Sequence, residues 1–140
     1  MHALTEKRLL QAAVAVACLV PLFAGGSGVV LGAEMMRGVG GGAPIDLDSH
    51  FRYLSGLLLG IGFAFAWCIP RIERHTVLFR TLGLIAIVGG LGRLLGLAER
   101  GVPGAGHVFG LCMELGTVPL LLLWQARVAR RCGSALPERP

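Results

Sequence analysis

The stretch Asp46–Gly60, DLDSHFRYLSGLLLG, decides the fold of this chain, because a polar loop turns into a very apolar helix within it. The polar residues at its start stand within eight positions: Asp46, Asp48, His50, Arg52 and Tyr53. A long apolar segment follows and stops at Pro70. Such a boundary is typical of a helix that enters a membrane, with its first turn still at the polar surface.

The composition extends this interpretation to the whole chain. Of its 140 residues 54% are hydrophobic and 15% charged, and the mean hydropathy is +0.72. A helix of about 20 apolar residues crosses the hydrocarbon layer of a bilayer, and four such runs are present, at about 9–32, 49–69, 77–98 and 107–126. The sequence therefore predicts an all-α integral membrane protein, an antiparallel up-down four-helix bundle. Residues 1–8 form its N-terminal segment, 9–127 its single transmembrane domain and 128–140 a basic tail.

The distribution of positive charge predicts the orientation. Nine of the thirteen Lys and Arg residues lie in the amino end, in 70–80 or in the tail, and loops rich in these residues stay in the cytoplasm. Both termini are expected there, in a multi-pass protein of the bacterial inner membrane, with the loops 33–47 and 101–106 outside. The net charge of +5 indicates no nucleic-acid partner, because no basic face interleaved with aromatic residues is present.

Three ionisable residues fall inside the predicted spans: Arg52, Arg93 and Glu114. A charge in hydrocarbon is costly unless it is paired or hydrated, so such residues usually face a protein interior. Arg93 and Glu114 stand about equally far from the turn near Pro103, and Arg52 is close to the outer end of its helix. We therefore expect an Arg52–Glu114–Arg93 cluster in the outer half of the bundle. Around it we expect a polar rim or ligand pocket that includes Asp48, His50, Tyr53 and His107.

Small residues accompany each of these charges at helical spacing. Small residues in membrane helices let neighbouring backbones approach closely. The glycines expected to make helix contacts are Gly56 and Gly60 beside Arg52, Gly89 and Gly96 beside Arg93, and Gly110 beside Glu114. Other helix faces that carry small residues have no expected partner helix within the bundle, and these faces are compatible with a homo-oligomer.

Several roles fit the polar cluster. It could lock the helices in register as an ion pair, hold a ligand, or pass protons. Asp46 and Asp48 also fit helix N-capping, and Asp48 is a second candidate partner for Arg52. The spacing of Asp46, Asp48, His50 and His107 matches no familiar metal site, and the four cysteines form no CxxC pair. No metal or cofactor is predicted.

The segments LDSHFRYLSGLLLGIG, CIPRIERHT, GGLGRLLGL and MEL resemble the DUF4345 family, small bacterial membrane proteins with a domain of unknown function. The resemblance covers about residues 8–127 and implies a four-helix membrane protein without an assigned activity. Arg52, Arg93 and Glu114 fall on its motif positions, whereas the glycine-rich segment 38–42 does not belong to the motif. A looser likeness to DoxX-type proteins hints at quinone or thiol redox partners.

Three functions remain in competition. The favoured hypothesis is a non-enzymatic binding or accessory protein whose partners are the lipid bilayer and a small lipophilic ligand or a membrane protein. The alternatives are a quinone- or thiol-linked redox protein and, with less support, a transporter of protons or small solutes. No hydrolase motif such as HExxH or a glycine elbow is present, so an enzyme is the less favoured interpretation.

Overall fold

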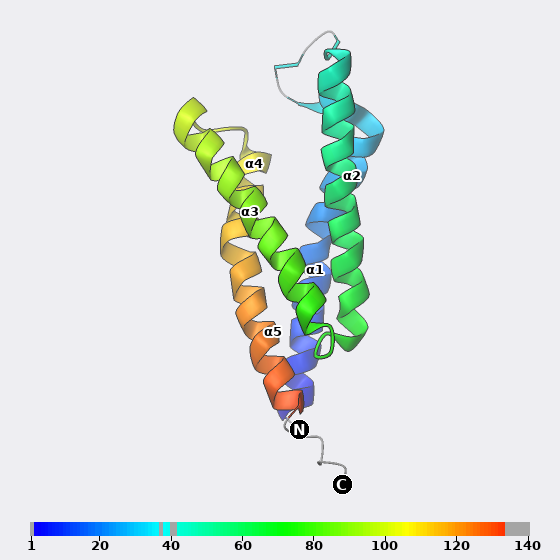
Figure 1. Cartoon of the computed structure of the whole chain (residues 1–140), viewed down its shortest axis with the longest axis vertical. Helices are drawn as coiled ribbons and strands as arrows, with labels where there is room; N and C mark the ends of the chain where they lie inside the picture. The colour runs from blue at the N-terminus through cyan, green and yellow to red at the C-terminus, as the bar shows by residue number, and fades with distance from the viewer. Residues whose placement is uncertain (1, 37, 40–41, 134–140) are drawn as a thin grey trace. The chain divides into compact units, whose positions relative to one another are not determined.

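The computed structural model describes residues 2–36, 38–39 and 42–133 (Figure 1). In the part of the chain that the structure describes, 89% of the residues are helical and no strand occurs. Four of its helical stretches are long and apolar enough to cross a membrane: Ala3–Met35, Ile45–Arg71, Thr76–Arg100 and Ala105–Gly133. The predicted all-α architecture with four membrane-length helices is confirmed.

The first two helical stretches extend further than their apolar runs. Helix α1 spans His2–Leu31 and continues into the 3-10 turn η1, Gly32–Met35. It begins well before the predicted residue 9, because Glu, Lys and Leu in its first turns are strong helix formers that need not lie in hydrocarbon. Helix α2 spans Ile45–Cys68 and starts ahead of the predicted residue 49, because Asp46 and Asp48 in its first turn interact favourably with the helix macrodipole. A second 3-10 turn, η2, follows it at Ile69–Arg71.

The third and fourth stretches form a hairpin. Helix α3 spans Thr76–Arg100, and the fourth stretch is built from α4, Ala105–Cys112, a π-helical turn η3, Met113–Thr117, and α5, Val118–Gly133. The fourth stretch ends beyond the predicted residue 126, because arginines in its last turn interact favourably with the helix macrodipole. The start of the predicted basic tail is thus helical, and residues 134–140 lie outside the described part.

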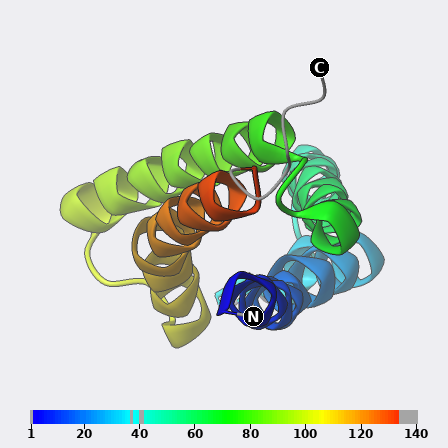
Figure 2. The same ribbon diagram turned by 90° about the horizontal axis from the view of Figure 1, so that it is seen from below.

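The helices fall into two compact units. The first unit comprises Met1–Ala12 with Cys68–Pro140, and the second comprises Ala13–Trp67. In the first unit α3 lies antiparallel to the α4–η3–α5 stretch, and in the second the greater part of α1 lies alongside α2 (Figures 1 and 2).

Close helix contacts are made by glycines other than those expected. An added Cβ at Gly25 of α1 would lie 2.6 Å from the backbone nitrogen of Leu59, and one at Gly90 of α3 would lie 2.8 Å from Glu114 Cβ. Close approaches of this kind also occur at Gly28, Gly62 and Gly83. By contrast, a Cβ at Gly60, Gly89 or Gly96 meets nothing within 4 Å, and one at Gly56 or Gly110 makes ordinary contact only. The expectation for these five glycines stays a prediction, because spacing defines a stripe on a helix but not the neighbour that it faces.

The connection between α2 and α3 is fixed by side chains from α1 and α5. Gln11 Nε2 donates to the carbonyl oxygen of Ile69 (2.7 Å), and Gln125 Nε2 donates to that of Ile72 (2.9 Å) and to Thr76 Oγ1 (2.9 Å). Both Ile72 and Gln125 are completely buried. These bonds satisfy carbonyl groups that would otherwise be left unpaired at the helix ends.

An ion pair between Lys7 Nζ and Glu73 Oε2 (2.9 Å) ties the first turns of α1 to the same connection. Burial, the largest single influence, raises the pKa of Glu73, but it is outweighed by hydrogen bonds from Lys7 and the Glu73 backbone and by the charges of Lys7 and Arg74. The net result is a lowered pKa. A carboxyl with a lowered pKa stabilises the fold above its ordinary pKa, and that contribution is lost as the pH falls through the lowered value.

We therefore expect the stability difference between wild type and Glu73→Gln to depend on pH. At pH 7 the variant should melt about 2–4 °C lower, which corresponds to an ion pair of about 1 kcal/mol. The gap should close below the ordinary pKa of 4.5, because protonation removes the same charge from the wild type. Melting curves of detergent-purified protein between pH 7 and pH 3 measure this, with the exposed Glu99→Gln as control. A gap that stays constant over that range would contradict the assignment.

Candidate functional site

In the second unit Arg52 and Asp48 join the end of α1 to the start of α2. Arg52 Nε donates to Asp48 Oδ2 (2.7 Å), and Nη1 donates to the carbonyl oxygens of Val29 (2.6 Å) and Val30 (3.1 Å). The second carboxylate oxygen of Asp48 accepts the backbone N–H of Ala33 (2.8 Å). Arg52 thus lies on the carbonyl end of α1, where the macrodipole favours a cation, although its own position near the start of α2 disfavours one.

Gly32 makes this arrangement sterically feasible. Its φ of +71° lies in the left-handed region, which is usual where a helix ends in glycine. A Cβ at this position would collide with Asp48 Oδ1 and would lie 2.5 Å from Arg52 Nη2. The glycine is therefore required both by the backbone turn and by the side chains that pack over it.

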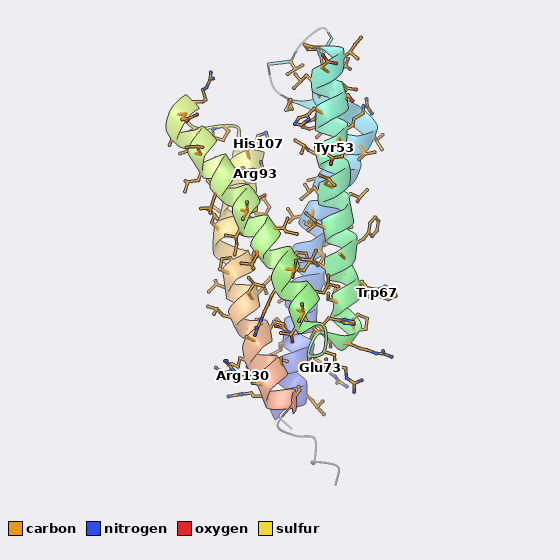
Figure 3. All side chains as sticks on the ribbon, in the orientation of Figure 1. Tyr53, Trp67, Glu73, Arg93, His107 and Arg130 are labelled. Atoms are coloured by element: carbon orange, nitrogen blue, oxygen red, sulfur yellow. The ribbon has the colours of Figure 1, made fainter. Side chains whose placement is uncertain are left out.

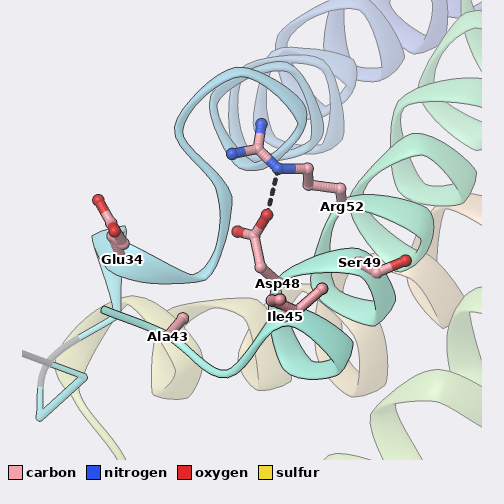
Figure 4. Close-up of a pocket in the computed structure, with 6 residues that line it drawn as sticks. All are labelled: Glu34, Ala43, Ile45, Asp48, Ser49 and Arg52. Carbon is pink, nitrogen blue, oxygen red and sulfur yellow. Dashed lines mark hydrogen bonds and ion pairs between the residues drawn. The ribbon is translucent and has the colours of Figure 1, made fainter.

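An open pocket of about 500 Å³ lies beside this pair (Figure 4). It is lined by Glu34, Ala43, Ile45, Asp48, Ser49 and Arg52. The other two residues of the expected rim in this unit, His50 and Tyr53, are exposed on α2, and no described hydrogen bond joins them to Arg52. The structure therefore brings together only Asp48 and Arg52 from the predicted site residues of this unit.

In the first unit Arg93 joins α3 to the fourth helical stretch. Its Nε lies 3.1 Å from Glu114 Oε1, to which it donates, and 3.0 Å from Oε2. Its Nη1 lies 3.0 Å from His107 Nδ1 (Figure 3). Because a guanidinium can only donate, Nδ1 of His107 accepts here, and the ring proton is carried by Nε2. The structure thus brings together Arg93, His107 and Glu114, as the sequence analysis expected.

Glu114 occupies the π-helical turn Met113–Thr117. Pro119 explains this turn in part, because it lacks the N–H that would bond the carbonyl of Leu115 in a regular α-helix. Single π-turns inside longer helices often occur at functional sites. The sequence analysis noted Pro119 within this helix but did not predict the π-turn.

One carboxylate oxygen of Glu114 lacks a hydrogen-bond donor within the part of the chain that the structure describes. Oε2 is buried and accepts no hydrogen bond from the described residues, since the N–H of Arg93 points toward Oε1. A buried carboxylate oxygen without a donor is unusual in folded proteins. It is therefore able to accept a donor group from another molecule.

The contacts described for each arginine lie within its own unit. Arg52 binds Asp48, one of the two carboxylates considered for it, whereas Glu114 binds Arg93. The single Arg52–Glu114–Arg93 cluster stays a prediction. Across the described ranges no group of three or more His, Cys, Asp or Glu residues is placed so that it could hold a metal ion.

Comparison with known proteins gives one match. Residues 9–125 match the family described as "Domain of unknown function (DUF4345)", whereas no curated protein and no solved structure matches the chain. The looser likeness to DoxX-type proteins stays a prediction. The match covers most of the chain, including Asp48, Arg52, Arg93, His107 and Glu114, and the chain therefore belongs to the DUF4345 family.

Proposed function

We propose that this protein is a non-enzymatic membrane protein that binds a small lipophilic ligand, or a partner in the membrane, at Arg93, His107 and Glu114. The observation that carries this proposal is the buried Glu114 Oε2, which accepts no hydrogen bond from the described residues. Oε2 is ion-paired with Arg93 but accepts no hydrogen bond within the described ranges, which favours a ligand that donates one from a hydroxyl or amine group.

The surroundings favour a ligand that is otherwise apolar. Leu91 and Leu94 of α3 and Phe109 of α4 are exposed on the two helical stretches that carry Arg93, His107 and Glu114. Both stretches, Thr76–Arg100 and Ala105–Gly133, are long and apolar enough to cross a membrane. A molecule that reaches the cluster from the lipid phase would therefore contact hydrocarbon along most of its length and polar groups at one end.

Two further parts of the proposal concern location and the redox alternative. Nine of the thirteen Lys and Arg residues lie on one predicted side, which supports the bacterial inner membrane with both termini in the cytoplasm. A quinone/quinol pair also fits the cluster, because a hydroxyl of the reduced form would donate to Glu114 Oε2, and Arg93 would donate to a carbonyl oxygen of the oxidised form. This is the second candidate, a quinone-linked redox protein.

The test compares wild type with Glu114→Gln and with Glu99→Gln, which neutralises an exposed carboxylate on the same hairpin. Each protein is purified in a mild detergent, its melting temperature is measured, and its organic extract is analysed by mass spectrometry. We expect one lipophilic compound to be retained by wild type and Glu99→Gln and to be reduced about tenfold in Glu114→Gln, since a hydrogen bond to a charged group is worth about 1.5–3 kcal/mol.

The melting temperature separates binding from structure. A Glu114→Gln protein that melts at or above the wild-type temperature, after the ligand has been removed from both, would support a carboxylate retained for binding. A large drop in melting temperature with identical extracts would assign the cluster to structure and overturn the proposal. A quinone in the wild-type extract would select the redox alternative.

A further inference from the structure

The strongest concentration of charge lies in the first unit, at the end that carries the start of α1, the α2–α3 connection and the end of α5. The described ranges place two acidic residues there, Glu6 and Glu73. The basic residues there are Lys7, Arg8, Arg71, Arg74, Arg80, Arg127, Arg130 and Arg131. Figure 3 shows Glu73 and Arg130 at this end.

The two carboxylates are already paired with part of this charge. Glu6 accepts from Arg127 Nε (2.9 Å) and from Arg131 Nη1 (2.6 Å), whereas Glu73 is paired with Lys7. These pairs hold the ends of α1 and α5 and the connection together. The exposed arginines at positions 8, 71, 74 and 80 form no ion pair with a described acidic residue, although the charge of Arg74 acts on nearby Glu73.

The connection presents its two arginines on a fixed backbone. It is anchored by Gln11, by Gln125 and by the buried Ile72. Within it the N–H of Arg74 donates to the carbonyl oxygen of Arg71 (2.8 Å), which closes a turn. Because this backbone is already held, a ligand that binds both guanidinium groups orders only their side chains, which lowers the entropic cost of binding.

We propose that this surface binds the phosphate headgroups of anionic phospholipids. We define it by Arg8, Arg71, Arg74 and Arg80 and call it the arginine surface. Guanidinium groups match the geometry of phosphate oxygens, and clusters of four to eight basic residues next to membrane helices typically bind anionic lipids. The apolar Val77, which is 81% exposed in the first turn of α3, favours a lipid over an acidic protein, because it offers a contact for an acyl chain beside the arginines.

The experiment measures lipid affinity directly. The full chain in a neutral detergent is titrated against fluorescent phosphatidylglycerol, and against phosphatidylcholine with the same label and acyl chains, by microscale thermophoresis. We expect tighter binding of phosphatidylglycerol. Arg71→Gln and Arg74→Gln should each weaken it about fivefold and together about 25-fold, at about 1 kcal/mol per basic residue near a membrane surface.

The matched control is Arg100→Gln, which removes an equal charge from an exposed position in the last turn of α3. It should leave phosphatidylglycerol binding within about twofold of wild type, because it lies at the opposite end of α3. The Arg71→Lys/Arg74→Lys protein keeps the charge and should bind between wild type and the double glutamine variant. Raising the salt from 0.1 M to 0.5 M should weaken binding to wild type, since screening shortens the range of the charges.

Several outcomes would overturn the proposal. Equal affinities for the two lipids would do so, and so would an equal loss of affinity in Arg100→Gln and Arg71→Gln. Displacement of the lipid by oligoglutamate at a lower concentration than by unlabelled phosphatidylglycerol would assign the arginine surface to an acidic protein instead. If the glutamine variants do not fold, the salt titration still tests the proposal. Binding of phosphatidylglycerol to wild type that does not change with salt would reject it.

Discussion

Replacing Gly25 with alanine is expected to lower the free energy of unfolding by about 3 kcal/mol, at the upper end of the range for overpacked sites. The added Cβ would lie 2.6 Å from the nitrogen of Leu59, 2.8 Å from the carbonyl oxygen of Ser55 and 2.9 Å from the Cα of Leu59. All three are backbone atoms of α2, so no rotation of a side chain relieves the overlap. The two helices of the second unit must move apart along their contact.

Gly26 supplies the matched control for this prediction. It is the next residue on α1, and an added Cβ there meets nothing within 4 Å. Gly26→Ala should be neutral or stabilising by up to about 1 kcal/mol, because alanine is the better helix former. Unfolding in mixed micelles with increasing denaturing detergent measures both variants. Equal stability of the two would show that α1 and α2 do not approach as closely at Gly25 as described.

Replacing Arg52 with glutamine is expected to destabilise the protein by about 2 kcal/mol. The change removes hydrogen bonds from a charged group to Asp48 and to the carbonyl oxygens of Val29 and Val30. Hydrogen bonds of this kind contribute about 1.5–3 kcal/mol, and the lower part of that range applies because the Arg52 side chain is 42% exposed. The loss also leaves the carboxylate of Asp48 without its cation.

Two variants test the cause of that loss. Arg52→Lys retains the charge at the carbonyl end of α1 but lacks the planar guanidinium group with its several donors. It should recover about half of the stability that Arg52→Gln loses. In Asp48→Asn the added effect of Arg52→Gln should be clearly smaller than in wild type, because contacting residues are coupled. Unfolding in mixed micelles measures all of these. If Arg52→Gln were as stable as the exposed Arg100→Gln, the contact between Arg52 and the end of α1 would contribute nothing.

Spacing in the sequence predicts some of the partners of Arg52 and Arg93 but not others. Asp48 and Arg52 are four residues apart, the spacing of neighbouring side chains on a helix, so their contact could be considered from the sequence. The other partners of Arg52 are carbonyl oxygens at the end of α1. No spacing indicates them, because every residue has a carbonyl group and only the fold leaves particular ones unpaired. Arg93 and Glu114 were expected together because a short hairpin sets their height.

The sequence by itself determined that this chain has four membrane-length helices, and it identified the charged residues within them. These follow from the length of the apolar runs and from the high cost of a charge in hydrocarbon, which are local properties. Only the tertiary structure decided which glycines bring helices into close approach, as Gly25 and Gly90 do. The physical reason is that a membrane helix is apolar on every side, so its sequence does not mark the face that meets a neighbour. Which carboxylate oxygen of Glu114 accepts a hydrogen bond likewise depends on the angle at which Arg93 approaches from another helix.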